Sequence, residues 1–91
     1  MEITELRNRI ERLNASICAV EELYKEAQSA EWNQWIMVTT STADALRRDP
    51  GYPMSRPEAL MRTGGALKEL AMLQRRHEDR LHRMEHPERY R

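Results

Sequence analysis

The chain has 91 residues and a mass of 10.8 kDa, which describes one small domain at most and excludes a multidomain enzyme. Its 15 basic and 15 acidic side chains balance, so no net charge indicates a nucleic-acid or membrane partner. So short a chain buries only about 60–65% of its unfolded surface, and long thin elements need a second chain to cover their apolar side. We therefore expect a homo-oligomer.

The single cysteine, Cys18, permits no intramolecular disulfide, so nothing indicates an oxidising compartment. The first residues lack the apolar core of a secretion signal, and no run approaches the ~18 apolar residues of a membrane span. We expect a cytoplasmic protein. Cys18 has no basic neighbour in the sequence to activate it as a nucleophile, so a half-buried structural thiol is the favoured interpretation.

Residues 3–27 carry apolar side chains at alternating spacings of three and four, which predicts an amphipathic helix. The pattern places isoleucine at a and leucine at d of a heptad, the combination that favours a parallel two-stranded coiled coil. The same stripe could instead pack within one chain, and the oligomer is only slightly favoured. The predicted oligomer interface consists of Ile3, Leu6, Ile10, Leu13, Ile17, Val20 and Tyr24.

No glycine or proline interrupts residues 1–49, so the sequence predicts one long helix over 3–48. The apolar pattern fades after residue 27, and we expect a bend or break at 28–32. Residues 35–42, WIMVTTST, are rich in the β-branched and aromatic types found in strands. Helix is still favoured there over a short strand, because no turn separates the segment from its flanks and a lone strand has no visible partner.

Residues 49–54 predict a turn, because two prolines and a glycine occur together there. A second helix is expected over 56–86, with Ser55 as its N-cap and Glu58 completing a capping box. Pro87 then ends that helix and leaves a tail over 87–91. The predicted fold is all-α: a hairpin of two long helices that assembles as a coiled-coil or helix-bundle homo-oligomer, with a dimer favoured.

Charge is divided unevenly between the two ends of the chain. Residues 1–31 carry four basic and seven acidic side chains, whereas residues 56–91 carry nine basic and six acidic ones. An antiparallel return of the second helix along the first would place these opposite charges side by side.

The segment Arg62, Thr63, Gly64, Gly65 is unusual, because each glycine within a helix costs about 1 kcal/mol relative to alanine. Three explanations compete. The glycines could let another helix approach closely, the helix could begin at Thr63, or free N–H groups with Arg62 could hold an anion such as a phosphate. Close helix approach is favoured.

Near the C-terminus, Glu78, His82 and His86 share one side of the helix, but the surrounding arginines favour a solvated basic face over a zinc site.

The partner-binding surface is predicted from the large aromatic side chains and the C-terminal arginines, because aromatic residues and arginine dominate interface hot spots. It consists of Trp32, Trp35, Tyr52, Arg75, Arg76, Arg80 and Arg83. Taken by themselves, the two tryptophans are slightly more typical of core residues than of a partner interface. Interspersed carboxylates dilute the arginines, which makes nucleic-acid binding a minor alternative.

The small, helical, charge-dense profile is similar to that of many phage or bacterial accessory proteins, which inhibit or adapt a larger machine by occupying its surface. We accordingly expect a non-enzymatic interaction protein that binds a protein partner and acts sterically, without cofactor or metal. The alternative is a small-ligand binder in which Arg62, Thr63, Gly64 and Gly65 hold a phosphorylated metabolite or signalling nucleotide at an oligomer interface.

Overall fold

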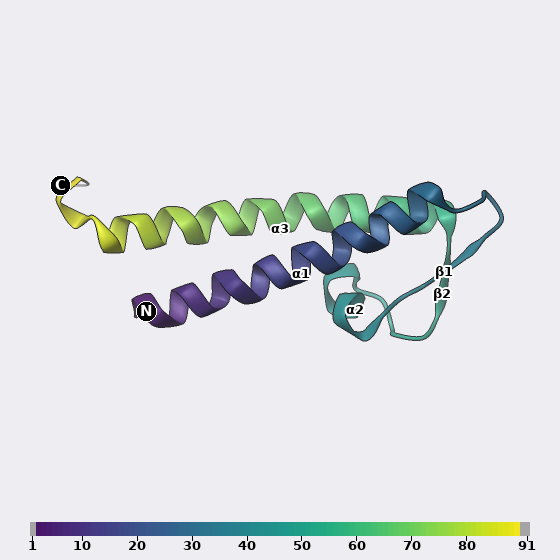
Figure 1. The fold of residues 1–91 in the computed structure, drawn as a ribbon, viewed down its shortest axis with the longest axis horizontal. Helices are drawn as coiled ribbons and strands as arrows, with labels where there is room; N and C mark the ends of the chain where they lie inside the picture. Colours follow the sequence, from purple (N-terminus) through teal and green to yellow (C-terminus); the bar gives the residue numbers. More distant parts are fainter. Residues whose placement is uncertain (1, 90–91) are drawn as a thin grey trace.

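A computed structural model describes residues 2–89 of the chain. In chain order these residues form helix α1 (Ile3–Ser29), strand β1 (Trp35–Met37), helix α2 (Thr40–Leu46), strand β2 (Pro53–Ser55), helix α3 (Arg56–Glu85) and a 3₁₀ turn η1 (Pro87–Arg89). The shape is elongated, 55 × 19 × 16 Å, with α1 and α3 running side by side (Figure 1). The described residues are mostly helical, as predicted. Residues 90 and 91 of the expected tail lie outside them.

The antiparallel pairing of α1 with α3 is fixed along its whole length by polar contacts. The guanidinium of Arg56, at the start of α3, donates to the carbonyl of Ala27 near the end of α1. Midway, the amide of Gln74 donates to the Asn14 side chain at 2.6 Å. Toward the far end, Arg7 and Glu85 form an ion pair at 3.5 Å. Arg7 is a basic residue on the mainly acidic first helix, and Glu85 is an acidic residue on the mainly basic last helix. The signs of this ion pair are therefore the reverse of the overall charge difference predicted from the sequence.

The apolar stripe of α1 is divided between positions that are buried within the chain and positions that are partly exposed. The first group, spaced by seven residues, packs against α3 and comprises Leu6, Leu13, Val20 and Ala27. Leu6 is fully buried within one chain, and so is Val20, which corrects their assignment to an oligomer interface. For these residues the alternative prediction, packing within one chain, applies. Ile3, Ile10, Ile17 and Tyr24 lie on one side of the buried row and are partly exposed.

The first helix ends at Ser29, not at residue 48, which corrects its predicted length and falls in the segment where a break was expected. No glycine or proline is needed, because local and distant groups satisfy the last carbonyls. The Ser29 hydroxyl donates to the carbonyls of Lys25 and Glu26, a bond that competes with helix continuation. From 29 residues away, Arg56 donates to the carbonyls of Ala27 and Gln28.

A short antiparallel ladder replaces the helix that was favoured over residues 35–42. Strand β1 pairs with β2 in the register Trp35↔Ser55, Ile36↔Met54 and Met37↔Pro53. Ile36 and Met54 point inward and are fully buried, so the middle pair anchors the ladder to the core. The helix prediction failed here because the partner strand, with proline at its first position, has no strand signature of its own. Helix α2 begins at Thr40, so it covers only the last three residues of that segment, and it continues to Leu46.

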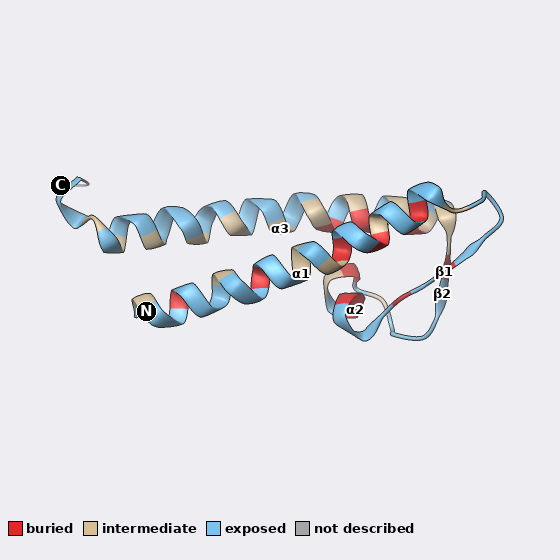
Figure 2. Ribbon diagram, in the orientation of Figure 1, coloured by how far each residue is buried: buried red, intermediate tan, exposed pale blue. Residues whose placement is uncertain are grey.

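The core lies mainly at the ladder end of the molecule, where α2 closes over α1 and α3 (Figure 2). It gathers Val20, Leu23, Ala27, Ile36, Val38, Ala43, Leu46, Met54, Ala59 and Ala66. Beyond α2, exposed residues predominate on the two long helices (Figure 2). The ladder end is therefore the most densely packed part of the molecule.

Candidate interaction surface

The outward face of the ladder carries large apolar side chains that remain more than half exposed. Trp35 and Met37 alternate with buried Ile36 along β1 and are 66% and 51% exposed. Opposite Met37 lies Pro53, which is also exposed. Because side chains of a strand point alternately to its two faces, burial of Ile36 forces its neighbours outward. One face of the ladder thus serves the core, and the other presents aromatic and thioether groups to solvent.

Two further aromatic side chains flank this ladder. Trp32 lies in the turn that leads into β1 and is 82% exposed, and Tyr52 immediately precedes β2 and is 62% exposed. The turn before β1 is closed by the Gln34 N–H donating to the carbonyl of Glu31. All these residues belong to the end of the molecule remote from the first turn of α1 (Figure 1). We call Trp32, Trp35, Met37 and Tyr52 the aromatic end. Met37 was not predicted, because its exposure follows from the ladder register.

The predicted partner-binding residues do not form one surface. The arginines lie on α3 far beyond the ladder: Arg75 follows the first residue of that helix by 19 positions, about 29 Å at 1.5 Å per residue. Arg76, Arg80 and Arg83 lie farther still along the same helix. The prediction of a combined aromatic and arginine surface is therefore corrected to two separate regions.

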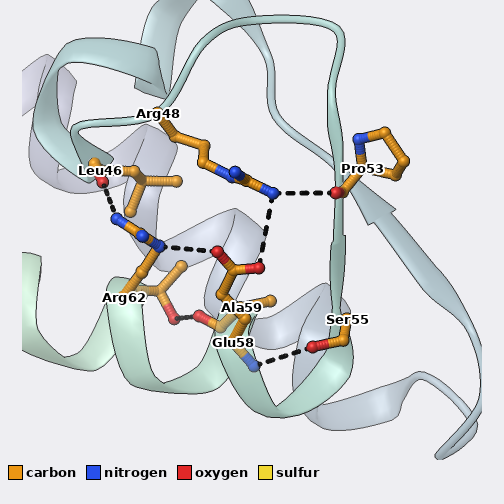
Figure 3. Close-up of polar contacts among 8 residues, drawn as sticks. Leu46, Arg48, Pro53, Ser55, Glu58, Ala59 and Arg62 are labelled. Carbon is orange, nitrogen blue, oxygen red and sulfur yellow. Dashed lines mark hydrogen bonds and ion pairs between the residues drawn. The ribbon is translucent and has the colours of Figure 1, made fainter.

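The predicted anion site is not assembled, because its charged member is used within the fold (Figure 3). The Nε of Arg62 donates to Glu58 at 3.0 Å, and its Nη1 donates to the carbonyl of Leu46 at 3.1 Å. On the other side of the same carboxylate, Arg48 lies 3.5 Å from Glu58 and donates to the carbonyl of Pro53. Through these two arginines, Glu58 of α3 is linked to α2, to the loop that follows α2, and to β2.

Thr63, Gly64 and Gly65 also lack the arrangement that an anion needs. Thr63 is fully buried, and its hydroxyl donates to the carbonyl of Ala59 at 2.6 Å. Gly64 and Gly65 lie well inside α3, where each N–H is directed at the carbonyl four residues earlier. The helix begins at Arg56 with the Ser55 hydroxyl accepting from the Glu58 N–H, so it does not begin at Thr63. A β-carbon on either glycine would meet no atom within 4 Å, so no helix of this chain approaches them closely.

The last candidate residues from the sequence are the C-terminal histidines and Cys18. The rings of His82 and His86 lie 4.9 Å apart, and His86 faces Glu88 at 3.7 Å. Over residues 2–89, no group of three or more histidine, cysteine or acidic side chains could hold a metal ion. Cys18 is a free thiol on the exposed surface, so the expected half-burial is corrected. None of the helices in this range combines the length and the apolarity that crossing a membrane requires.

Comparisons with protein-family models, curated proteins and solved structures found no match. Function is therefore argued from the chain's own surfaces. The aromatic end is the strongest of these, because it concentrates exposed apolar groups on the best-packed part of the molecule.

Proposed function

We propose that this chain is a helical interaction protein that binds a protein partner through its aromatic end and acts sterically, as an inhibitor or adaptor, and not by catalysis. One observation supports this proposal above the others: Trp35 and Met37 are exposed on a ladder whose opposite face is fully buried. Exposed tryptophans held by a packed scaffold supply large contact area with little loss of conformational freedom on binding. The free, exposed Cys18 fits a reducing compartment, and we place the protein in the cytoplasm.

The test is a double substitution, Trp32→Ala with Trp35→Ala, in a chain shown to remain folded by circular dichroism. Proteins captured from a lysate of the source cells are first identified and purified. Binding of each to the wild-type chain is then measured by calorimetry. We expect the double variant to bind at least tenfold more weakly, because truncation of a hot-spot residue typically costs about 2 kcal/mol or more.

The matched control is Met61→Ala with Met72→Ala. Both methionines are well exposed on α3, at 69% and 60%, and both lie away from the ladder. This control should bind as tightly as the wild type. A folded tryptophan variant that keeps full affinity would remove the aromatic end as the working surface.

A second, separate proposal concerns self-association. Ile3, Ile10 and Ile17 stay partly exposed on one side of α1, whereas the leucines and the valine of the same heptad stripe are buried. We propose that two copies pair through this side, because paired isoleucines at heptad spacing form a self-complementary surface. Sedimentation equilibrium over a range of concentrations should show a dimer. Ile10→Glu should shift it to monomer, and a wild type that stays monomeric throughout would refute the pairing.

A further inference from the structure

The groove between α1 and α3 is filled by α2 over only part of its length. On α1, the start of α2 meets Ala19, Leu23 and Glu26, which line a hollow together with Thr39 and Ser41. On α3, the end of α2 meets Arg62, Ala66 and Glu69. The same helix faces can be followed away from the ladder in steps of three or four residues. These steps lead to Ser16 and then Arg12 on α1, and to Leu73 on α3. Helical periodicity places these residues on the same side as α2.

The continuation is an open groove of about 260 Å³ with an apolar floor and basic walls. Its lining consists of Arg9, Arg12, Leu13, Ser16, Leu73 and His77. Leu13 and Leu73 form the floor, and Leu73 is 41% exposed although it lies between the two helices. A third helix would cover this floor as α2 covers the groove nearer the ladder.

Arginines flank the groove on both long helices. Arg76 and Arg80 follow Leu73 at spacings of three and seven, which extends the basic wall along α3. Across residues 2–89, none of the ion pairs takes in a member of the set Arg9, Arg12, Arg76 and Arg80. Three carboxylates stand near the groove: Glu5 is one turn before Arg9, Glu69 is paired with Arg47 at 3.6 Å, and Asp79 follows Arg76 by three residues on the side turned away from Leu73.

We propose that this groove binds an amphipathic helix of a partner protein, with leucine-sized side chains on its buried stripe and glutamate or aspartate along both flanks. The occupant completes a three-helix arrangement: its apolar stripe covers Leu13 and Leu73, and its carboxylates face the arginines on both walls. The groove lies on α3 and α1 beyond α2, so this second site is independent of the aromatic end.

A second copy of the chain is a poorer occupant. The buried stripes of α1 and α3 are already committed to each other. The partly exposed isoleucines of α1 and the groove lie on opposite sides of the buried row. If the isoleucines were inserted into the groove of a second copy, two different surfaces would meet, which is a head-to-tail contact. Such contacts extend into filaments unless the rotation closes a ring.

The test uses two fluorescein-labelled synthetic helical peptides of about 18 residues, five turns. Both carry the same leucine stripe, and they differ only in having glutamate or lysine at the flanking positions. Binding to the full chain is followed by fluorescence anisotropy. We expect the glutamate peptide to bind, with an affinity that falls as salt is added, and the lysine peptide to bind at least tenfold more weakly.

Charge reversal then locates the site. Arg9→Glu with Arg12→Glu should weaken binding of the glutamate peptide about tenfold, and Arg76→Glu with Arg80→Glu should do the same from the other wall. The matched control is Arg75→Glu, an equal change on the same helix, where Arg75 lies with Lys68 and Met72 away from the groove. This control and Trp35→Ala should both bind like the wild type, which separates the groove from the aromatic end.

Three results would overturn the proposal. The first is equal affinity for the two peptides, or no binding of either. The second is undiminished binding by both charge-reversal variants, each confirmed as folded by circular dichroism. The third is a dimer in sedimentation that the Arg9 and Arg12 reversal dissociates while Arg75→Glu does not, since a second copy would then be the occupant.

Discussion

Replacing Gly64 and Gly65 by alanine should stabilise the fold. Both glycines lie in the interior of the 30-residue helix α3, and a β-carbon at either would meet no atom within 4 Å. Glycine in a helix interior is about 1 kcal/mol less favourable than alanine, because its backbone loses more freedom on folding. With no clash to offset that gain, the double variant should be more stable by about 2 kcal/mol.

The expected change is easily measured in a chain of this size. A gain of 1 kcal/mol raises the Tm of such a domain by about 4–8 °C, so the double variant should melt about 8–16 °C higher. Thermal and urea unfolding, followed by far-ultraviolet circular dichroism at several protein concentrations, give the Tm and the free energy of unfolding. The urea m-value should not change, because the folded structure is the same.

Gly51→Ala provides the matched control. Gly51 also has open space around it, but its φ of +87° lies in the region that disfavours side chains, so alanine there should lower stability by about 1 kcal/mol. An unchanged or lower Tm in the Gly64 and Gly65 variant, with the expected loss in Gly51→Ala, would refute the reasoning. It would mean that another helix backbone packs on the glycines, as in a tightly associated oligomer.

Four further substitutions test the packing of the ladder end. Ile36→Ala should lower the free energy of unfolding in urea by about 2–5 kcal/mol because Ile36 is fully buried, whereas Trp35→Ala next to it should change it by less than about 0.5 kcal/mol. Glu58→Gln leaves two arginines without their shared carboxylate and should lower stability by about 2 kcal/mol, seen as a lower Tm. Arg56→Lys loses the planar fork that reaches two carbonyls of α1 and should lose about 1 kcal/mol, with faster hydrogen exchange at the end of that helix.

The helices could be predicted where their signals are local. Ser55 and Glu58 form the cap expected from their spacing, and α3 begins at Arg56 and ends at Glu85, within one residue of prediction. A break at residues 28–32 was expected from the fading apolar pattern, but the group that fixes it could not be predicted in the same way, because the carbonyl of Ala27 is satisfied by Arg56, 29 residues later. The ladder was missed for a related reason: β1 is stabilised by pairing with three residues that carry no strand signal of their own.

The candidate sites were also predictable only where the signal is local. The tryptophans were recognisable from residue type, but the exposure of Trp35 follows from the strand register and that of Trp32 from its place in the turn before β1. Arg62 and Thr63 looked available, yet both are occupied by carbonyls and a carboxylate of the same chain. The basic groove was not anticipated, because the sequence does not reveal how α1 and α3 are rotated about their axes or where α2 stops. Helix periodicity identifies rows of residues, and only the fold shows which rows face each other.

The antiparallel pairing of α1 with α3 has a consequence for the order of folding. Contacts near the ladder close short loops, 29 residues for Arg56 with Ala27, whereas the Gln74 to Asn14 contact spans 60 residues. Each doubling of loop length adds about 0.6 kcal/mol of closure entropy, and the distant turns have no α2 to cover them. The two helices should therefore zip together from the ladder outward and open from the far end first, so amide protection along α1 should decline steadily toward its first turn.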